Sequence, residues 1–184
     1  MPLRKGGFFV SVKKMVTCAM CLALATVTGL IRIYQFPFGG SVTLCSMLFV
    51  MLPGWLFGPV YGVVTGLCYG LIDFITEPFF MSIPQFLFDY VFAFSVMGAA
   101  GFLRKKPLLP GYLAAVFVRW IMATIAGLIW VRLGYQAWEG WSPLPYSALY
   151  NAAYIFTEAA VTAAVLAIPA MKKALEQVKN SFAS

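Results

Sequence analysis

A few ionisable residues interrupt an otherwise apolar sequence, and these are the ones that could do chemistry. Asp89, Arg119 and Glu158 each stand alone inside a long apolar stretch, while Asp73 and Glu77 lie four residues apart at the end of another. An ionisable group at membrane depth is costly and is a candidate for binding or proton transfer. We interpret Arg119 and Glu158 as a structural ion pair, because no histidine or further acid continues a proton relay. For Asp73 and Glu77 the alternative is a solvated helix end.

Aromatic residues accompany the acids in the same parts of the sequence. An aromatic belt at the membrane interface would explain many of them. Carboxylates beside stacked rings, however, also form the kind of site that binds a small aromatic cation. The pattern therefore predicts an outward-opening site for a flat or cationic solute. The aromatic residues are Tyr34, Phe36, Phe38, Tyr69, Tyr90, Trp130, Tyr135, Trp138, Trp141, Tyr146 and Tyr150.

Metal, cofactor and enzyme chemistry have little support in the residue types. The chain has no histidine, which removes the usual general base. Cys18 and Cys21 form a C-x-x-C, but no second pair completes a zinc site, and a buried free cysteine behaves as a small apolar residue. We expect no metal, no cofactor and no catalytic residue. An intramembrane enzyme and a membrane scaffold remain remote alternatives.

The composition indicates which elements must position these residues. The chain has 184 residues, of which 62% are hydrophobic and only 10% are charged. Soluble domains carry about 25% charged residues. We therefore predict an all-α integral membrane protein, with residues 1–184 forming a single membrane domain of six transmembrane helices in a compact bundle. The helices are expected at about 15–33, 42–57, 60–76, 84–103, 109–131 and 145–171, with loops at 34–41 and 132–144.

The basic residues predict the orientation of this bundle. Lys and Arg prefer the cytoplasmic side in short loops. Six helices with both termini in the cytoplasm place ten of the thirteen Lys and Arg residues inside and leave Arg32 and Arg132 outside. The net charge of +7 then reflects topology in a multi-pass protein of the cell membrane, facing the anionic lipid of the bilayer. No nucleic-acid partner is needed to explain it.

Small residues recur at four-residue spacing on two of the predicted helices. Gly58, Gly62, Gly66 and Gly70 would share one face of the helix at 60–76. Such a face allows another backbone to approach closely, and we favour tight packing over a surface that lines a ligand. Ala19 and Ala23 form a similar, weaker pattern in the helix at 15–33.

Several motifs taken together resemble a known family. They are FGGSVTL at 38–44, the glycine series that ends at Gly70, IPQFLFDY at 83–90 followed by GAAGF at 98–102, and PLPYSALYNAAY at 143–154 followed by Glu158. In this order, over roughly residues 15–170, they resemble the thiamine-specific substrate-binding (S) components, of the ThiT type, of energy-coupling factor (ECF) transporters. Such proteins bind a vitamin with high affinity and have six spans.

The resemblance implies a set of substrate-binding residues. Asp89, Tyr90, Tyr146 and Asn151 correspond to contacts with the vitamin, with Asp89 standing where the family usually has Glu. Trp130 or Trp138 would take the place of a stacking tryptophan. The family typically has a histidine four residues after the arginine that corresponds to Arg119, and here that position is Ala123. The alternative ligand is therefore a related small vitamin or a pyrimidine precursor.

The resemblance also implies protein partners. The pair Ala19 and Ala23 matches the motif by which such components dock on a transmembrane coupling subunit. The chain lacks a G-x-x-x-x-G-K-[ST] phosphate loop, so the energy for transport would come from two separate ATPase subunits. We expect the pocket in the outer half, formed by the helices at 84–103, 109–131 and 145–171 and capped by the loops at 34–41 and 132–144.

Overall fold

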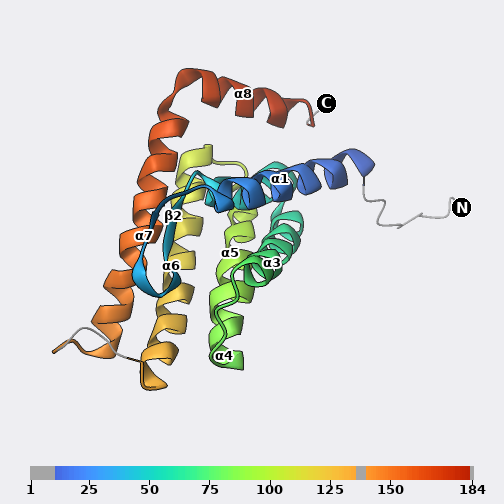
Figure 1. Ribbon diagram of the computed structural model, residues 1–184. Coiled ribbons are helices and arrows are strands. Elements are labelled where there is room, and N and C mark those ends of the chain that lie inside the picture. The colour runs from blue at the N-terminus through green and yellow to red at the C-terminus, as the bar shows by residue number, and fades with distance from the viewer. Residues whose placement is uncertain (1–10, 136–139, 183–184) are drawn as a thin grey trace, which may run out of the picture.

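The computed structural model describes residues 11–135 and 140–182. Trp138 and Glu139 fall outside these ranges, as do Arg4 and Lys5. The chain forms a helical bundle with one short hairpin (Figure 1). The elements are α1 (Val12–Leu30), β1 (Arg32–Gln35), η1 (Pro37–Gly39), β2 (Ser41–Thr43), α2 (Ser46–Phe57), α3 (Pro59–Thr76), α4 (Ile83–Phe86), η2 (Leu87–Phe92), α5 (Ala93–Gly98), η3 (Ala99–Leu103), α6 (Leu108–Arg132), α7 (Pro143–Ala167) and α8 (Pro169–Asn180).

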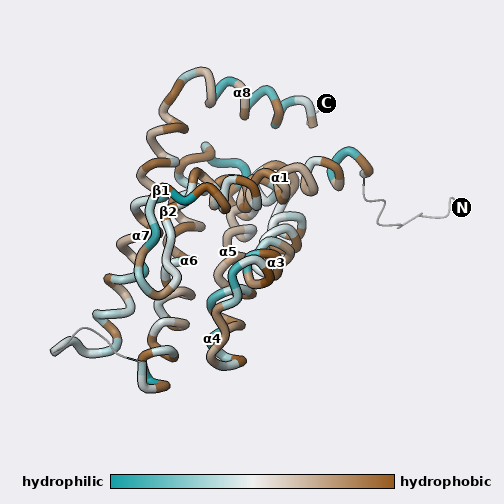
Figure 2. The backbone as a smooth tube through the Cα atoms, viewed as in Figure 1, coloured by the Kyte–Doolittle hydropathy of each residue, from teal (hydrophilic) through white to brown (hydrophobic). Residues whose placement is uncertain are grey.

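Within the described part of the chain, five helical segments are long and apolar enough to cross a bilayer. They are α1, α3, the continuous segment Ile83–Leu103, α6 and α7. Helix α2 is apolar but has only 12 residues, which corresponds to about 18 Å against a hydrocarbon core of about 30 Å. The all-α membrane fold is therefore confirmed, and hydrophilic residues collect mainly at helix ends, on the hairpin and along α8 (Figure 2). The count of six spans stays a prediction.

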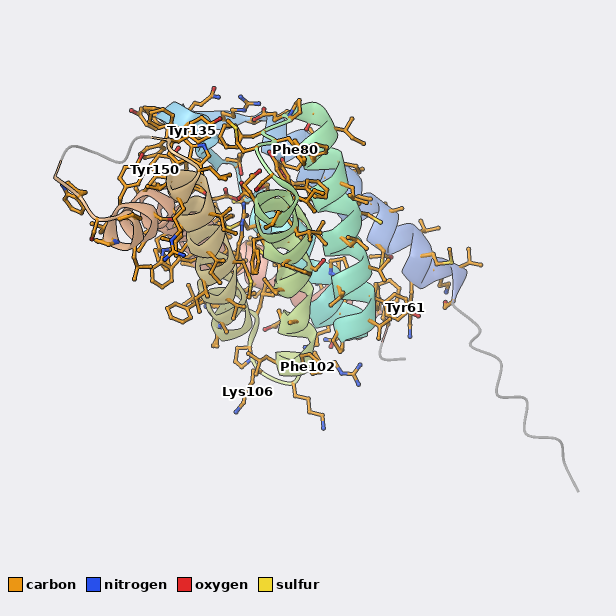
Figure 3. All side chains as sticks on the ribbon, turned by 90° about the horizontal axis from the view of Figure 1, so that it is seen from below. Tyr61, Phe80, Phe102, Lys106, Tyr135 and Tyr150 are labelled. Carbon is orange, nitrogen blue, oxygen red and sulfur yellow. The ribbon has the colours of Figure 1, made fainter. Side chains whose placement is uncertain are left out.

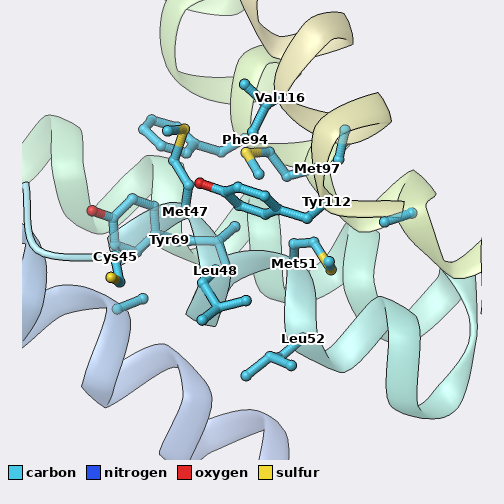
Figure 4. Packing of buried hydrophobic residues seen from close by; sticks show 14 of the residues in the cluster. Cys45, Met47, Leu48, Met51, Leu52, Tyr69, Phe94, Met97, Tyr112 and Val116 are labelled. Atoms are coloured by element: carbon cyan, nitrogen blue, oxygen red, sulfur yellow. The ribbon is translucent and has the colours of Figure 1, made fainter. Parts of the chain in front are cut away.

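Helix α2 forms the centre of the bundle. Ten of its 12 residues are buried, and it packs against α1, α3, α5 and α6. Met47, Leu48 and Met51 lie close to Tyr69 of α3 and Tyr112 of α6 (Figure 4). A helix that is apolar on every side has to be enclosed by others, and this explains why α2 can be shorter than its neighbours.

The glycine face of α3 packs against the backbone of the next span. A Cβ atom at Gly62 would lie 2.6 Å from the Cα of Gly98, and one at Gly66 would lie 2.2 Å from the carbonyl oxygen of Phe94. Contact this close is possible only without side chains. The expected packing role is confirmed for Gly62, Gly66 and Gly70, whereas Gly58 precedes α3 and meets only the side chain of Arg104. None of the four lines the central cavity described below.

The span Ile83–Leu103 departs from regular α-helix at two places. Residues 87–92 form a π-helical turn, in which the amide of Ala93 donates to the carbonyl of Phe88, and residues 99–103 form a 3-10 turn. Ser82 caps the beginning of the span by accepting a hydrogen bond from the Gln85 amide at 3.3 Å. The predicted limits 84–103 are thus nearly right. The π turn, which carries Asp89 and Tyr90, has no signature in the hydrophobic pattern.

Two sequence predictions at the ends of spans are wrong. The helix expected at 15–33 ends at Leu30, and the expected loop at 34–41 is an antiparallel hairpin in which Tyr34 pairs with Val42. The helix expected at 145–171 ends at Ala167, because Ile168 has a ψ of 121° immediately before Pro169. The ring of a proline disfavours helical geometry in the preceding residue. The following residues form the separate helix α8, whose direction differs from that of α7 (Figure 1).

The two ends of the bundle carry different residues. Tyr135, Tyr150 and Phe80 lie at one end, and Phe102 and Lys106 lie at the other (Figure 3). The second end holds the α5–α6 connection with Arg104, Lys105 and Lys106. Its basic character predicts that this end faces the cytoplasm.

Cysteine labelling tests this orientation. Ser142 and Ser181 are both exposed and are expected on opposite sides of the membrane. In intact cells a membrane-impermeant maleimide should label Ser142→Cys directly, but Ser181→Cys only after permeabilisation. The unsubstituted chain, which has four cysteines of its own, is the blank. The reverse labelling order would contradict cytoplasmic termini.

Candidate functional site

A cavity of about 160 Å³ lies between the hairpin and the surrounding helices. The hairpin contributes Phe38 and Gly40, α3 contributes Tyr69 and Asp73, and α1, the span Ile83–Leu103, α6 and α7 supply the remaining walls. The expectation that only the three helices after residue 84 form the pocket is therefore too narrow. Helix α3 takes part because its glycine contacts bring it against α5, and α1 takes part through Gly29, which faces the Tyr69 hydroxyl of α3. Of the expected cap at 132–144, none of the described residues lines the cavity.

Acidic side chains are concentrated in this cavity. Four of the six acidic residues of the chain line it, namely Asp73, Glu77, Asp89 and Glu158, together with Arg119. Arg32 forms an ion pair with Glu77 at the rim. Four carboxylates thus face two guanidinium groups, although the chain as a whole is basic. A water-poor space with this charge favours a cationic ligand.

Gln85 holds the carboxylate of Asp89 in place. The Gln85 side-chain amide donates to Asp89 Oδ2 at 3.0 Å and to the Phe79 carbonyl at 3.2 Å, and its Oε1 accepts from the Met81 amide at 3.2 Å. Gln85 is 1% exposed, so its orientation is fixed. In the described part of the chain nothing donates to Asp89 Oδ1. This oxygen is available to a ligand.

Tyr90 connects the π turn to the α3–α4 connection. Its hydroxyl donates to the Glu77 carbonyl at 3.0 Å and accepts from the Phe79 amide at 3.1 Å. Its ring lies 5.1 Å from Phe74 in an edge-to-face arrangement. Tyr90 lines the cavity as predicted, and these contacts also give it a role in holding the 77–82 segment.

Asn151 lies at the contact between α6 and α7. Its Nδ2 donates to the carbonyls of Ala123 at 3.2 Å and Ser147 at 2.9 Å, and its Oδ1 accepts from the Tyr154 hydroxyl at 2.6 Å. Asn151 is 5% exposed. Its hydrogen-bonding groups therefore already have partners in the protein, and a ligand would share them.

Aromatic rings form much of the cavity wall. Trp130 is stacked on Tyr135 with ring centroids 5.2 Å apart. The centroid of the Phe38 ring, in the hairpin, lies 5.3 Å from that of Trp130. Tyr146 and Tyr150 follow each other along α7, with their rings 6.1 Å apart and nearly parallel. The Trp130 Nε1 atom is buried and has no hydrogen-bond partner among the described residues. A flat ligand would thus find rings on two sides of the cavity.

The hairpin is fastened to α7 over the cavity. The Tyr150 hydroxyl donates to the Pro37 carbonyl and accepts from the Gly40 amide at 3.0 Å. A Cβ atom at Gly40 would lie 2.7 Å from the Tyr154 ring, so this position requires glycine for the close approach. The predicted capping role of segment 34–41 agrees with this arrangement.

The predicted ion pair between Arg119 and Glu158 does not form. Glu158 is 3% exposed and accepts four hydrogen bonds. Two come from the amide and hydroxyl of Thr43 at the end of β2, at 3.3 and 2.7 Å, and two from the Ser46 hydroxyl and the Met47 amide at the start of α2, at 3.0 Å each. The Arg119 guanidinium instead lies 4.3 Å from the centre of the Phe94 ring. Glu158 does not pair with Arg119 because its carboxylate accepts from the Met47 amide at the N-terminus of the buried helix α2 and from its neighbours, and such an amide needs an acceptor.

Five of the six predicted substrate-binding residues thus line one cavity: Asp89, Tyr90, Trp130, Tyr146 and Asn151. The sixth, Trp138, lies outside the described residues. Sequence reasoning missed Gln85 and Tyr154, whose partners lie on the same face four and three residues away. Because residues three or four apart lie on the same face of a helix, the spacing of these pairs could have indicated both contacts from the sequence. The capping role of Glu158 had no such signal, because its partners are more than 110 residues away.

These features define a polytopic membrane protein with an acidic, aromatic cavity for a small solute. The sequence model of the family described as "Thiamine transporter protein (Thia_YuaJ)" matches residues 15–178. The chain belongs to this thiamine transporter family, and it is a multi-pass membrane transport protein rather than an enzyme.

A solved structure supports the same fold. A structure described as ThiT from Listeria monocytogenes superposes with a TM-score of 0.74 at 19% identity, covering 93% of this chain and 97% of that one. Among curated proteins, none matches the sequence significantly.

Replacement of Glu158 tests its structural role. Glu158→Ala removes the acceptor for two amides and two hydroxyls, and loss of one partner of a buried charged network costs about 3 kcal/mol or more. We expect a melting temperature about 6–12 °C lower in detergent. Glu176→Ala on the exposed face of α8 removes the same charge and should change it little. Equal melting temperatures for the Glu158 variant and the unsubstituted chain would contradict this role.

Proposed function

We propose that the chain is the thiamine-binding S component of an ECF transporter and that the cavity is its binding site. The observation that carries the proposal is the gathering of four carboxylates and several aromatic rings in one cavity of a chain whose net charge is +7. Thiamine has a permanently cationic thiazolium ring and an aminopyrimidine ring. Each of these two features finds a complementary group in the cavity.

Charge complementarity favours a ligand with a positive charge. Glu77 is paired with Arg32, and Glu158 is occupied by the start of α2. Asp73 and Asp89 therefore remain, with Arg119 as the cation of the cavity. A monocationic ligand lowers the excess negative charge of the cavity, in which four carboxylates face the two guanidinium groups of Arg32 and Arg119, and a nearby carboxylate offsets the desolvation cost of the ligand.

We assign Asp89 to the aminopyrimidine ring. Its Oδ1 has no partner in the described part of the chain, and Gln85 keeps the carboxylate oriented. An amino group of the ligand would donate a charge-assisted hydrogen bond to this oxygen, which contributes about 1.5–3 kcal/mol. Asn151 and Tyr146 lie in the same cavity and complete the polar contacts.

The rings of Trp130, Tyr146 and Tyr150 would stack on the ligand. Cation–π contact with a tryptophan or tyrosine face contributes about 2 kcal/mol when the cation is desolvated. Ala123 lines the cavity where the family typically has a histidine. The small side chain removes one contact with the thiazolium half, so the proposed site relies more on the remaining rings.

The energy for transport would come from other subunits. Ala19 and Ala23 are both exposed on α1, whereas Cys21 and Ala25 on the opposite side are buried. Small side chains on a free helix face allow another helix to approach closely. We propose that this face docks on a transmembrane coupling subunit, which in turn carries two ATPase subunits.

Titration of tryptophan fluorescence tests the site. Asp89→Asn keeps the shape but removes the charge, and it should weaken thiamine binding about ten- to a hundredfold. Asn151→Ala should also weaken binding. The control Glu176→Gln removes a carboxylate from α8, far along the chain from the cavity, and should bind thiamine normally. If thiamine affinity is indifferent to both cavity substitutions, the residue assignment fails; if other vitamins bind and thiamine does not, the ligand assignment fails.

Bulky replacements on α1 test the docking face. Ala19→Trp with Ala23→Trp should abolish thiamine uptake in cells, because the rings prevent close helix approach, while the isolated chain still binds thiamine. Met20→Trp with Leu24→Trp adds rings to an adjacent exposed strip of α1 and is the matched control. Normal uptake by the Ala19 and Ala23 variant would refute the assignment.

A further inference from the structure

A second hollow lies at the basic end of the bundle, away from the central cavity. It is a groove of about 450 Å³ between the α2–α3 turn and η3, and we call it the basal groove. Residues 57–61 form one side, and Gly101, Phe102, Arg104 and Lys105 form the other. Phe102 lies at the end of the bundle together with Lys106 (Figure 3). The basal groove shares no residue with the proposed thiamine site.

Cations converge on the basal groove, and none of the described residues that line it is acidic. Arg104 and Lys105 line it, and the Lys14 ammonium lies 5.9 Å from the ring of Phe57 and 5.8 Å from that of Tyr61, both of which also line it. The guanidinium of Arg104 reaches over Gly58, 3.5 Å from where a Cβ would stand. Like charges held together in this way are stabilised by an anion.

Lys179 adds a further cation beside this group. Its ammonium donates to the Arg104 carbonyl at 2.6 Å and lies 3.8 Å from the centre of the Trp55 ring. Burial first, and the positive charge of Arg104 second, lower the pKa of Lys179 from its usual value. Lys179 thus places another amine beside the Arg104 main chain, close to the basal groove.

An apolar surface continues from the basal groove along the outside of the bundle. Val60 is 61% exposed, Val64 one turn later on α3 is 55% exposed, and Phe102 is 77% exposed. Exposed apolar side chains next to clustered cations suit an amphiphile, with its anionic part on the cations and its hydrocarbon part on the apolar side chains.

We propose that the basal groove binds the headgroup of an anionic phospholipid, with an acyl chain lying along Val60, Val64 and Phe102. The three features that define this ligand are the cation cluster of Lys14, Arg104 and Lys105, the lack of acidic lining residues, and the apolar continuation. A coupling protein would need acidic residues opposite the same cations. The lipid needs only its phosphate and its chain.

Native mass spectrometry of the detergent-solubilised full chain tests the site. The chain should retain one phosphatidylglycerol molecule in preference to phosphatidylcholine with the same acyl chains. Arg104→Gln with Lys105→Gln should weaken retention about thirtyfold, the factor that corresponds to about 2 kcal/mol for two cations near an anionic lipid. Lys105→Gln alone, at an exposed side chain, should weaken it about fivefold.

A matched control distinguishes lipid binding in the basal groove from non-specific electrostatic attraction of the lipid to a basic surface. Lys172→Gln with Lys173→Gln removes the same charge from exposed positions of α8 and should leave retention unchanged. Equal loss in this control, or equal retention of phosphatidylcholine, would overturn the proposal. Displacement of the lipid by millimolar glycerol phosphate would overturn it too, since that result would assign a free phosphate instead.

A test of assembly with the coupling subunit shows whether the basal groove is a protein interface instead of a lipid site. If the Arg104 and Lys105 variant keeps its lipid but no longer assembles, the basal groove is a protein interface and the proposal is wrong. Thiamine binding by the same variant should be normal, which shows that the bundle is folded. Retained thiamine binding together with weakened phosphatidylglycerol retention supports the lipid site.

Discussion

A helix that is buried inside an apolar bundle must find acceptors for the polar groups of its first turn, and here the carboxylate of Glu158 accepts from the Ser46 hydroxyl and the Met47 amide of α2. The same carboxylate also binds Thr43 at the end of the hairpin. One buried group on α7 therefore holds the centre of the core and the cover of the cavity in register. Because an unmet amide or carboxylate would be costly in this medium, the positions of β2, α2 and α7 depend on one another.

The cavity results from that constraint together with the close packing of α3. The glycine face brings the α3 backbone against the span Ile83–Leu103, so Tyr69 and Asp73 reach the same space as Asp89. The π turn at residues 87–92 places Asp89 and Tyr90 on this side. Local departures from α-helix of this kind are frequent at functional sites, and here the departure aligns a carboxylate with the buried amide of Gln85.

Charge is divided between the central cavity and one end of the molecule. The acids collect in the central cavity, where they favour a cation, whereas the cations collect at the basal groove and on α8. The basic end predicts the orientation in the membrane, because Lys and Arg prefer the cytoplasmic side. The acidic cavity is the site that we propose for the solute. The net charge of +7 thus hides two regions of opposite sign with different tasks.

The sequence by itself determined the limits of three spans, because apolar runs and their Gly and Pro boundaries act locally: α3, α6 and the span Ile83–Leu103 begin and end within a residue or so of their predicted limits. The resemblance in motifs also predicted Asp89, Trp130 and Asn151 as members of one site, and all three line one cavity. Tertiary structure alone decided the partner of Glu158, the hairpin and the helices that enclose the cavity. These depend on contacts between segments such as Thr43 and Glu158, 115 residues apart, and hydrogen-bond partners at that separation follow from packing rather than from local pattern.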